Sequence, residues 1–145
     1  MDRFQIAPHV ITLLGAYLLA LPIGWNRERQ ARSAGLRTFP LVALASCGFV
    51  QAAEVLAAGS PEAMSRIIEG LITGVGFIGG GAILKQGSIV HGTATAASLW
   101  ATGAIGAAVG LGAYDVAITI AAFTILTLQL LSHGKEEQND SKKDS

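Results

Sequence analysis

The chain has 145 residues, of which 51% are hydrophobic and only 14% are charged, and its mean hydropathy is +0.51. Ten lysines and arginines balance ten acidic residues, so the formal net charge is zero. This composition excludes an ordinary soluble domain. We expect no nucleic-acid partner, and the single cysteine, Cys47, excludes an intramolecular disulfide framework.

Long apolar stretches without charges dominate the sequence. In chain order, five segments approach the roughly 20 residues that a helix needs to cross a hydrocarbon core: about 10–25, 39–58, 66–84, 94–112 and 114–132. The first segment has no A-x-A cleavage site, so we interpret it as an uncleaved span. The sequence therefore predicts an all-α protein, with a bundle of about five transmembrane helices over residues 1–132 and a disordered cytoplasmic tail over 133–145.

The third segment is unusually rich in glycine. In lipid a helix is nearly compulsory, and small residues four positions apart allow helices to approach closely. We therefore predict glycine-rich packing faces, formed in this segment by Gly70, Gly74, Gly76, Gly79 and Gly80. Residues 74–79 also match the dinucleotide pattern G-x-G-x-x-G, but no acidic residue follows at the required distance, so we reject nucleotide binding.

The positions of lysine and arginine predict the orientation. With five spans, eight of the ten basic residues fall on one side of the membrane, and only Arg3 and Arg66 fall on the other. Because basic residues accumulate on the cytoplasmic side, we expect the N-terminus outside and the C-terminus in the cytoplasm.

The connection after the first span, residues 25–38, contains four arginines and Glu28. One interpretation is an anchor that touches anionic lipid; the other is a docking surface for an acidic partner or a phosphate, which arginine can bind through two hydrogen bonds. A carboxylate at the membrane boundary usually has a partner, and we expect Arg29 or Arg37 to pair with Glu28.

Two acidic residues, Glu54 and Glu69, fall near the outer ends of predicted spans. They are expected at similar depth and form either an interfacial ion pair with Arg66 or a cation site at an outer mouth. Two carboxylates do not make a metal cage, so the sequence predicts no metal site and no cofactor. Serine, histidine and carboxylate residues form no hydrolase pattern, and we expect no catalytic residue and no enzyme activity.

The connection 85–92 places two apolar residues between turn formers, and we expect it to return toward the bilayer. The segment after it carries small residues on two faces, so it can pack on two sides. Its predicted neighbour is the glycine-rich segment.

Three stretches together resemble the MgtC/SapB family: IGWNRERQ at 23–30 with AGLRT at 34–38, TGVGFIGGGAI at 73–83, and VHGTATAASLW at 90–100. The resemblance covers about residues 8–131, the transmembrane domain, without the ACT-like C-terminal domain of many relatives. It implies a multi-pass protein of the bacterial inner membrane, linked to survival under magnesium limitation, that contacts other inner-membrane proteins. The positions that match the family pattern are Glu28, Arg29, Gln30, Gly35, Arg37, Thr38, Gly74, Gly76, Gly79 and Thr95. Among the departures, His91 stands where the family usually has arginine.

Three functions are compatible with these features. The first is a protein that regulates or accompanies another membrane complex, through the arginine-rich connection and residues 85–92. The second is a carrier of a small solute or ion, with a path between the third and fourth helices lined by Gly74, Gly76, Thr95 and Ser98 and with Glu69 at its mouth. The third is a homo-oligomeric scaffold assembled through glycine faces.

Overall fold

A computed structural model describes residues 6–30, 34–57 and 59–140 of the chain. It contains five helices and one two-stranded hairpin in the described residues. In chain order they are α1 (Ile6–Arg29), α2 (Thr38–Ala57), α3 (Pro61–Gly81), β1 (Leu84–Gln86), β2 (Ile89–His91), α4 (Thr93–Gly110) and α5 (Tyr114–Asp140). The predicted helical architecture is confirmed.

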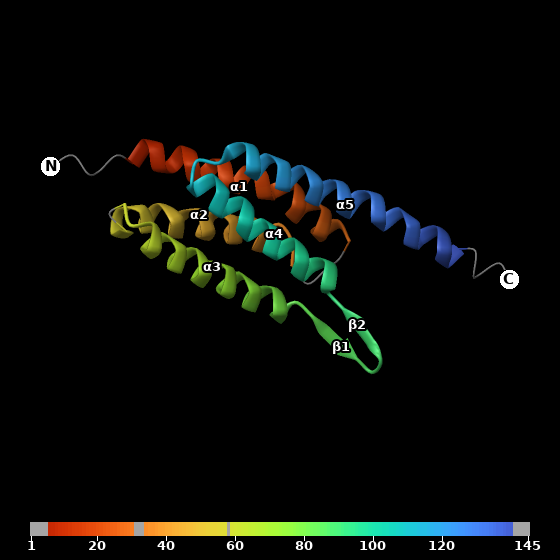
Figure 1. Cartoon of the computed structure of the whole chain (residues 1–145). Coiled ribbons are helices and arrows are strands. Elements are labelled where there is room, and N and C mark those ends of the chain that lie inside the picture. Colours follow the sequence, from red (N-terminus) through yellow and green to blue (C-terminus); the bar gives the residue numbers. More distant parts are fainter. Residues whose placement is uncertain (1–5, 31–33, 58, 141–145) are drawn as a thin grey trace.

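The helices run back and forth along the bundle, with the start of α1 at one end and the last turn of α5 at the other (Figure 1). Helix α4 lies centrally, because it packs against each of the other four helices. The core between them consists mainly of small and branched apolar side chains, with Phe39, Ile23 and Leu99 as its largest buried members.

Helix α4 can occupy this central place because its glycines let neighbours approach its backbone. A Cβ added at Gly106 would meet the backbone oxygen of Ala43 in α2, and one added at Gly103 would lie 2.8 Å from Val75 Cγ2 in α3. Real side chains do not approach that closely. Close contact through small residues, expected for a membrane bundle, therefore occurs here on two faces of α4.

Two helix boundaries differ most from the predicted ones. Helix α3 begins at Pro61 rather than near residue 66, because Ser60 caps it: the Ala63 amide donates to Ser60 Oγ at 3.3 Å. Helix α5 continues to Asp140, through residues 133–140 of the predicted disordered tail, and residues 141–145 lie outside the described part of the chain. Extending an existing helix needs no new nucleus, so polar helix formers can prolong an apolar span.

Residues 84–91 form an antiparallel hairpin, which the sequence did not predict. Lys85 pairs with Val90 and Gln86 with Ile89, and Gly87 makes the turn with a φ of 61°. The hairpin projects beyond the ends of α3 and α4 (Figure 1), and all six strand residues are exposed. It extends the bundle at one end instead of folding back along it.

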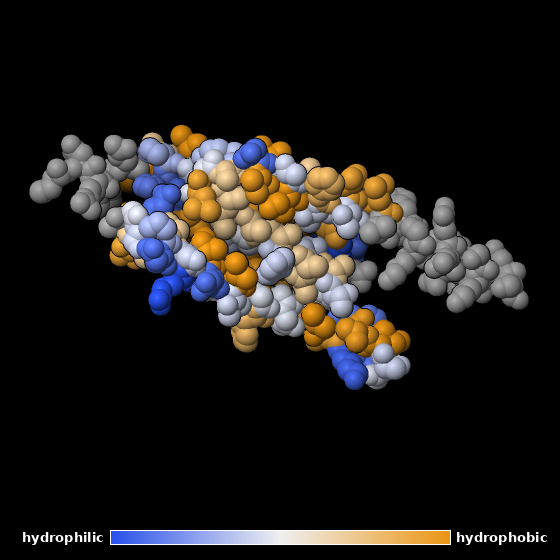
Figure 2. Space-filling view, viewed as in Figure 1, coloured by the Kyte–Doolittle hydropathy of each residue, from blue (hydrophilic) through white to orange (hydrophobic). Residues whose placement is uncertain are grey.

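The outer surface of the bundle is strongly apolar. Large hydrophobic side chains are exposed along α1, α2, α3 and α5, among them Phe77 at 85% and Phe123 at 66%. Figure 2 shows apolar side chains over the middle of one face and again on the hairpin. By length and composition α1 and α2 are able to cross a membrane, and Tyr114–Leu130 is a shorter apolar stretch. Exposed apolar area on this scale is typical of a surface that contacts lipid.

Candidate functional site

The end of the bundle that carries the hairpin also gathers basic residues. Arg27 and Arg29 lie in the last turn of α1, Arg37 directly precedes α2, and Lys85 lies on β1. Arg29, Arg37 and Lys85 are exposed. We call Arg29, Arg37 and the hairpin Leu84–His91 the basic end surface.

Glu28, near the end of α1, forms a hydrogen bond to the residues that lead into α2. The backbone amide of Leu36 donates to Glu28 Oε2 at 3.1 Å, so this carboxylate bonds to a backbone group and not to Arg29 or Arg37. A Cβ at Gly35 would collide with the same carboxylate. The sequence singled out Glu28 and Gly35, and the structure brings these two residues together. In place of the expected ion pair with Arg29 or Arg37, the Glu28 carboxylate accepts this hydrogen bond.

The same connection positions the start of α2. The Gly35 carbonyl accepts the amides of Thr38 at 3.0 Å and Phe39 at 3.2 Å, which fixes the first turn. Gln30 Nε2 donates to Asn26 Oδ1 at 3.4 Å, within the end of α1. These residues shape the connection, whereas Arg29 and Arg37 extend from it.

Arg27 is a residue that the sequence analysis missed. Its side chain is only 4% exposed, although it belongs to the same basic run as Arg29. The spacing of residues along α1 could have predicted this burial. The buried face of the helix contains Ala16, Ala20, Ile23 and Arg27, which are three or four positions apart. Burial removes Arg27 from the basic end surface.

The two acids at the opposite end are not gathered into one site. Both Glu54 and Glu69 are exposed, but only Glu54 lines a cavity of about 360 Å³, together with the turn between α2 and α3. Since α3 starts at Pro61, Glu69 lies more than two turns inside the helix and not at the depth of Glu54. In the described part of the chain no three His, Cys, Asp or Glu residues come close enough to hold a metal ion.

The predicted glycine face of α3 is largely open. A Cβ at Gly79 would lie 3.2 Å from the backbone oxygen of Ala96, whereas one at Gly70, Gly74, Gly76 or Gly80 would meet nothing within 4 Å. Within one chain, therefore, Gly79 is the one of these five glycines at which a side chain would meet another helix. The packing role of the other four remains a prediction.

The residues of the predicted carrier path do not line a common cavity. Gly74 and Gly76 face open space, while Thr95 and Ser98 are buried in the bundle at 1% and 4% exposure. Ser98 Oγ donates to the Ala94 carbonyl at 2.6 Å, within its own helix. Thr95 likewise belongs to the interior and not to an exposed contact surface.

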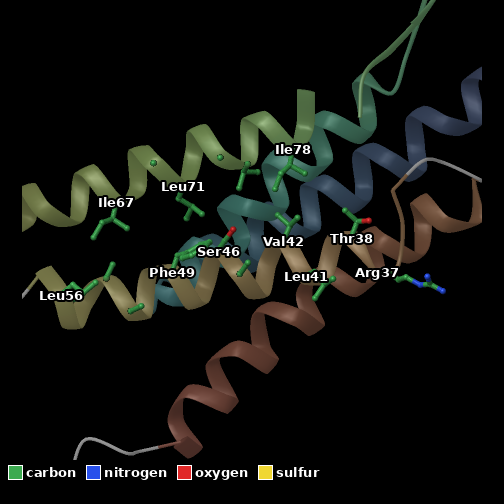
Figure 3. Close-up of a pocket in the computed structure, with 16 residues that line it drawn as sticks. Arg37, Thr38, Leu41, Val42, Ser46, Phe49, Leu56, Ile67, Leu71 and Ile78 are labelled. Atoms are coloured by element: carbon green, nitrogen blue, oxygen red, sulfur yellow. The ribbon is translucent and has the colours of Figure 1, made fainter. Parts of the chain in front are cut away.

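A larger hollow lies between α2 and α3. It has a volume of about 770 Å³ and is lined almost entirely by apolar side chains and glycine, with Arg37 and Thr38 among its lining residues. Figure 3 shows Ile67, Leu71 and Ile78 of α3 facing the α2 row that runs from Leu56 to Thr38. Arg37 extends at the end of that row. We call this hollow the α2–α3 groove.

Comparison with known proteins identifies the relatives of this chain. The model of the MgtC family matches residues 13–136. Protein MgtC of Salmonella typhimurium (strain LT2) is 38% identical over 127 residues, which is 88% of this chain and 52% of the relative. Protein MgtC of Brucella abortus (strain 2308) is 38% identical over 119 residues, 82% of this chain and 49% of the relative.

A third relative, Protein SrpB of Synechococcus elongatus, is 41% identical over 128 residues, 80% of this chain and 70% of the relative. No solved structure matches the chain. The chain spans about half the length of the MgtC relatives. The family expected from the three sequence stretches is thus confirmed, and the protein belongs to the MgtC family.

Proposed function

We propose that the protein is a five-span protein of the bacterial inner membrane that regulates or accompanies another membrane protein complex. The partner binds the basic end surface and presents acidic groups there. The physiological setting is adaptation to stress such as magnesium limitation, a proposal that rests on the family resemblance alone.

The orientation is part of this proposal. The described chain begins and finishes at opposite ends of the bundle, as an odd number of crossings requires (Figure 1). The exposed residues Arg29, Arg37 and Lys85 lie at the hairpin end, while Arg66 lies near the start of α3 at the other. The bias of basic residues toward the cytoplasm supports a cytoplasmic hairpin.

The observation that carries the proposal is the hairpin itself. Leu84, Ile89 and Val90 are each more than half exposed, on an element that projects beyond the helices instead of packing along them. Exposed apolar side chains at an end of the molecule that also carries arginines are typical of protein interaction surfaces, in which arginine is enriched. A surface that merely anchors the chain to lipid needs the cations but no projecting hairpin.

The test is charge reversal at Arg29, which lies on this surface but does not line the α2–α3 groove. We expect Arg29→Glu to abolish co-purification of a partner from native membranes and growth at low magnesium in a strain lacking the protein. The reason is that like charges facing each other across an interface cost several kcal/mol. The matched control is Arg66→Glu, an exposed arginine at the opposite end.

Resistance of both variants to extraction by alkaline carbonate checks that they are inserted in the membrane. Full activity of Arg29→Glu, or equal loss in Arg66→Glu, contradicts the proposal.

A further inference from the structure

The α2–α3 groove is not used by the proposed docking surface, although Arg37 belongs to both. It follows α2 from Thr38 to Leu56, a length of about 27 Å at the rise of an α-helix. That length is close to the roughly 30 Å thickness of the hydrocarbon core of a bilayer. In a membrane the groove would therefore be filled by something apolar.

The width of the groove favours a hydrocarbon chain over a helix as its occupant. A volume of about 770 Å³ for the centres of water molecules, spread over about 27 Å, gives a mean cross-section of about 30 Å², and adding the radius of a water molecule on each side gives a groove roughly 9 Å wide. An α-helix with its side chains is about 10–12 Å across, so a helix can place only a ridge of side chains in this groove. An extended acyl chain can lie within it.

Glycine and alanine create this space. Gly70 and Gly74 line the groove from α3, and a Cβ at either position would meet nothing within 4 Å. Ala45 and Ala52 line it from α2. Larger side chains at these four positions would close the gap between the two helices.

Charge is confined to one end of the groove. Among the described residues that line it, Arg37 is the one with a charge, and Thr38 lies beside it. Exposed Arg29 and Lys85 lie at the same end of the bundle, whereas the opposite end carries Arg66 together with the acidic residues Glu54 and Glu62. The end with Arg37 is therefore the more positive of the two and attracts an anionic head group more strongly.

We propose that the α2–α3 groove is a binding site for one anionic phospholipid. The phosphate contacts Arg37, with Thr38 beside it as a hydrogen-bond donor, and one acyl chain lies along the groove toward Phe49. One leaflet is about half of the hydrocarbon core, so a single acyl chain reaches the middle of the groove. The other half of the groove faces the opposite leaflet, and it accepts an acyl chain of a second lipid without any preference for the head group of that lipid.

The experiment titrates phosphatidylglycerol or phosphatidylcholine into the full chain in detergent and counts bound lipids by native mass spectrometry. We expect the wild type to prefer phosphatidylglycerol. Arg37→Gln should weaken phosphatidylglycerol about fivefold, the effect of one basic residue near an anionic surface, and weaken phosphatidylcholine less, because the choline of that head group neutralises its phosphate. The matched control for charge is Arg66→Gln.

A second variant tests the groove itself. Gly74→Leu fills the space and should weaken both lipids, while Gly76→Leu, equally open but not a lining residue, should change neither. If Gly74→Leu does not fold, as judged by circular dichroism, Gly70→Leu replaces it. These measurements in detergent require neither a partner nor a particular orientation, so they succeed or fail independently of the proposed function.

Three results would overturn the lipid site: unchanged phosphatidylglycerol binding in Arg37→Gln, an equal loss in Arg66→Gln, or unchanged binding in the groove-filling variant that folds. A dimer that retains no lipid and becomes monomeric in Gly74→Leu would also overturn it, because a second copy would then cover the groove.

Discussion

Glycines that look alike in the sequence have opposite environments in the bundle. At Gly106 a side chain would collide with the backbone oxygen of Ala43, whereas at Gly76 it would meet nothing within 4 Å. The first glycine sets the distance between α4 and α2. The second has no such role within one chain.

We therefore predict that Gly106→Ala destabilises the bundle by about 1–3 kcal/mol, the usual cost of overpacking a closely packed core. The obstacle is a backbone atom of a neighbouring helix, which cannot rotate away. Unfolding of the purified protein by a titration with sodium dodecyl sulfate, followed by circular dichroism, measures the change. Gly76→Ala is the matched control and should be neutral or slightly stabilising, since alanine has the higher helix propensity. Equal stability of the two variants would refute this role of Gly106.

At the same scale, the sequence singled out Glu28 and Gly35 without predicting what they contact. The acceptor role of Glu28 toward the Leu36 amide depends on the tertiary position of Leu36 relative to the end of α1. The spacing of the buried residues of α1 predicts that Arg27 is buried, but the neighbouring arginines led us to group it with the exposed basic residues.

At the scale of single elements, α3 shows how a capping residue sets a boundary. Ser60 accepts the Ala63 amide and donates to Glu62 Oε2 at 3.1 Å, and Pro61 occupies the first turn. These short-range signals place the start of the helix ahead of its apolar segment. As a result Glu69 lies more than two turns inside α3, whereas a helix that began near residue 66 would have placed it in the first turn.

We predict that Ser60→Ala destabilises the protein by about 1 kcal/mol, the typical cost of losing an N-cap side chain. Faster hydrogen exchange of the Ala63 amide would locate the effect in the first turn of α3. Ser65→Ala, an exposed serine inside the same helix, is the matched control. Unchanged protection of the Ala63 amide in Ser60→Ala would show that this cap has no stabilising role.

The hairpin is the element that the sequence pattern missed. Each strand is only three residues long, too short for a clear alternation of apolar and polar residues. Gly92, which follows the second strand, adopts a φ of 88°, and a Cβ at this position would collide with the Ala82 carbonyl. The hairpin therefore depends on close contact between the residues just before β1 and just after β2.

At the scale of the whole molecule, charge and apolar surface are segregated along the axis of the bundle. The middle exposes large hydrophobic side chains, one end carries Arg29, Arg37 and Lys85, and the other carries Glu54, Glu62 and Arg66. This arrangement fits a bilayer around the middle and water at both ends.

We predict that an introduced cysteine at Ser65 reacts with an impermeant maleimide in intact cells, whereas one at Ser88 reacts only after lysis. The proposed orientation places the start of α3 outside and the hairpin in the cytoplasm. Both changes are made in a Cys47→Ser background, which removes the native thiol. Ser98→Cys is a control that should not react in either condition, because this position is buried. Labelling at Ser88 in intact cells would reverse the orientation.

The sequence by itself determined the helical class, the approximate helical segments, the family and the accumulation of basic residues beside the first connection. These properties follow from local composition and spacing, which any single segment carries. Only the tertiary structure decided at which glycines a neighbouring helix comes close, which backbone amide donates to the Glu28 carboxylate, and that a groove lies between α2 and α3. Those features depend on the relative rotation and distance of helices far apart in the chain, and no local pattern specifies either quantity.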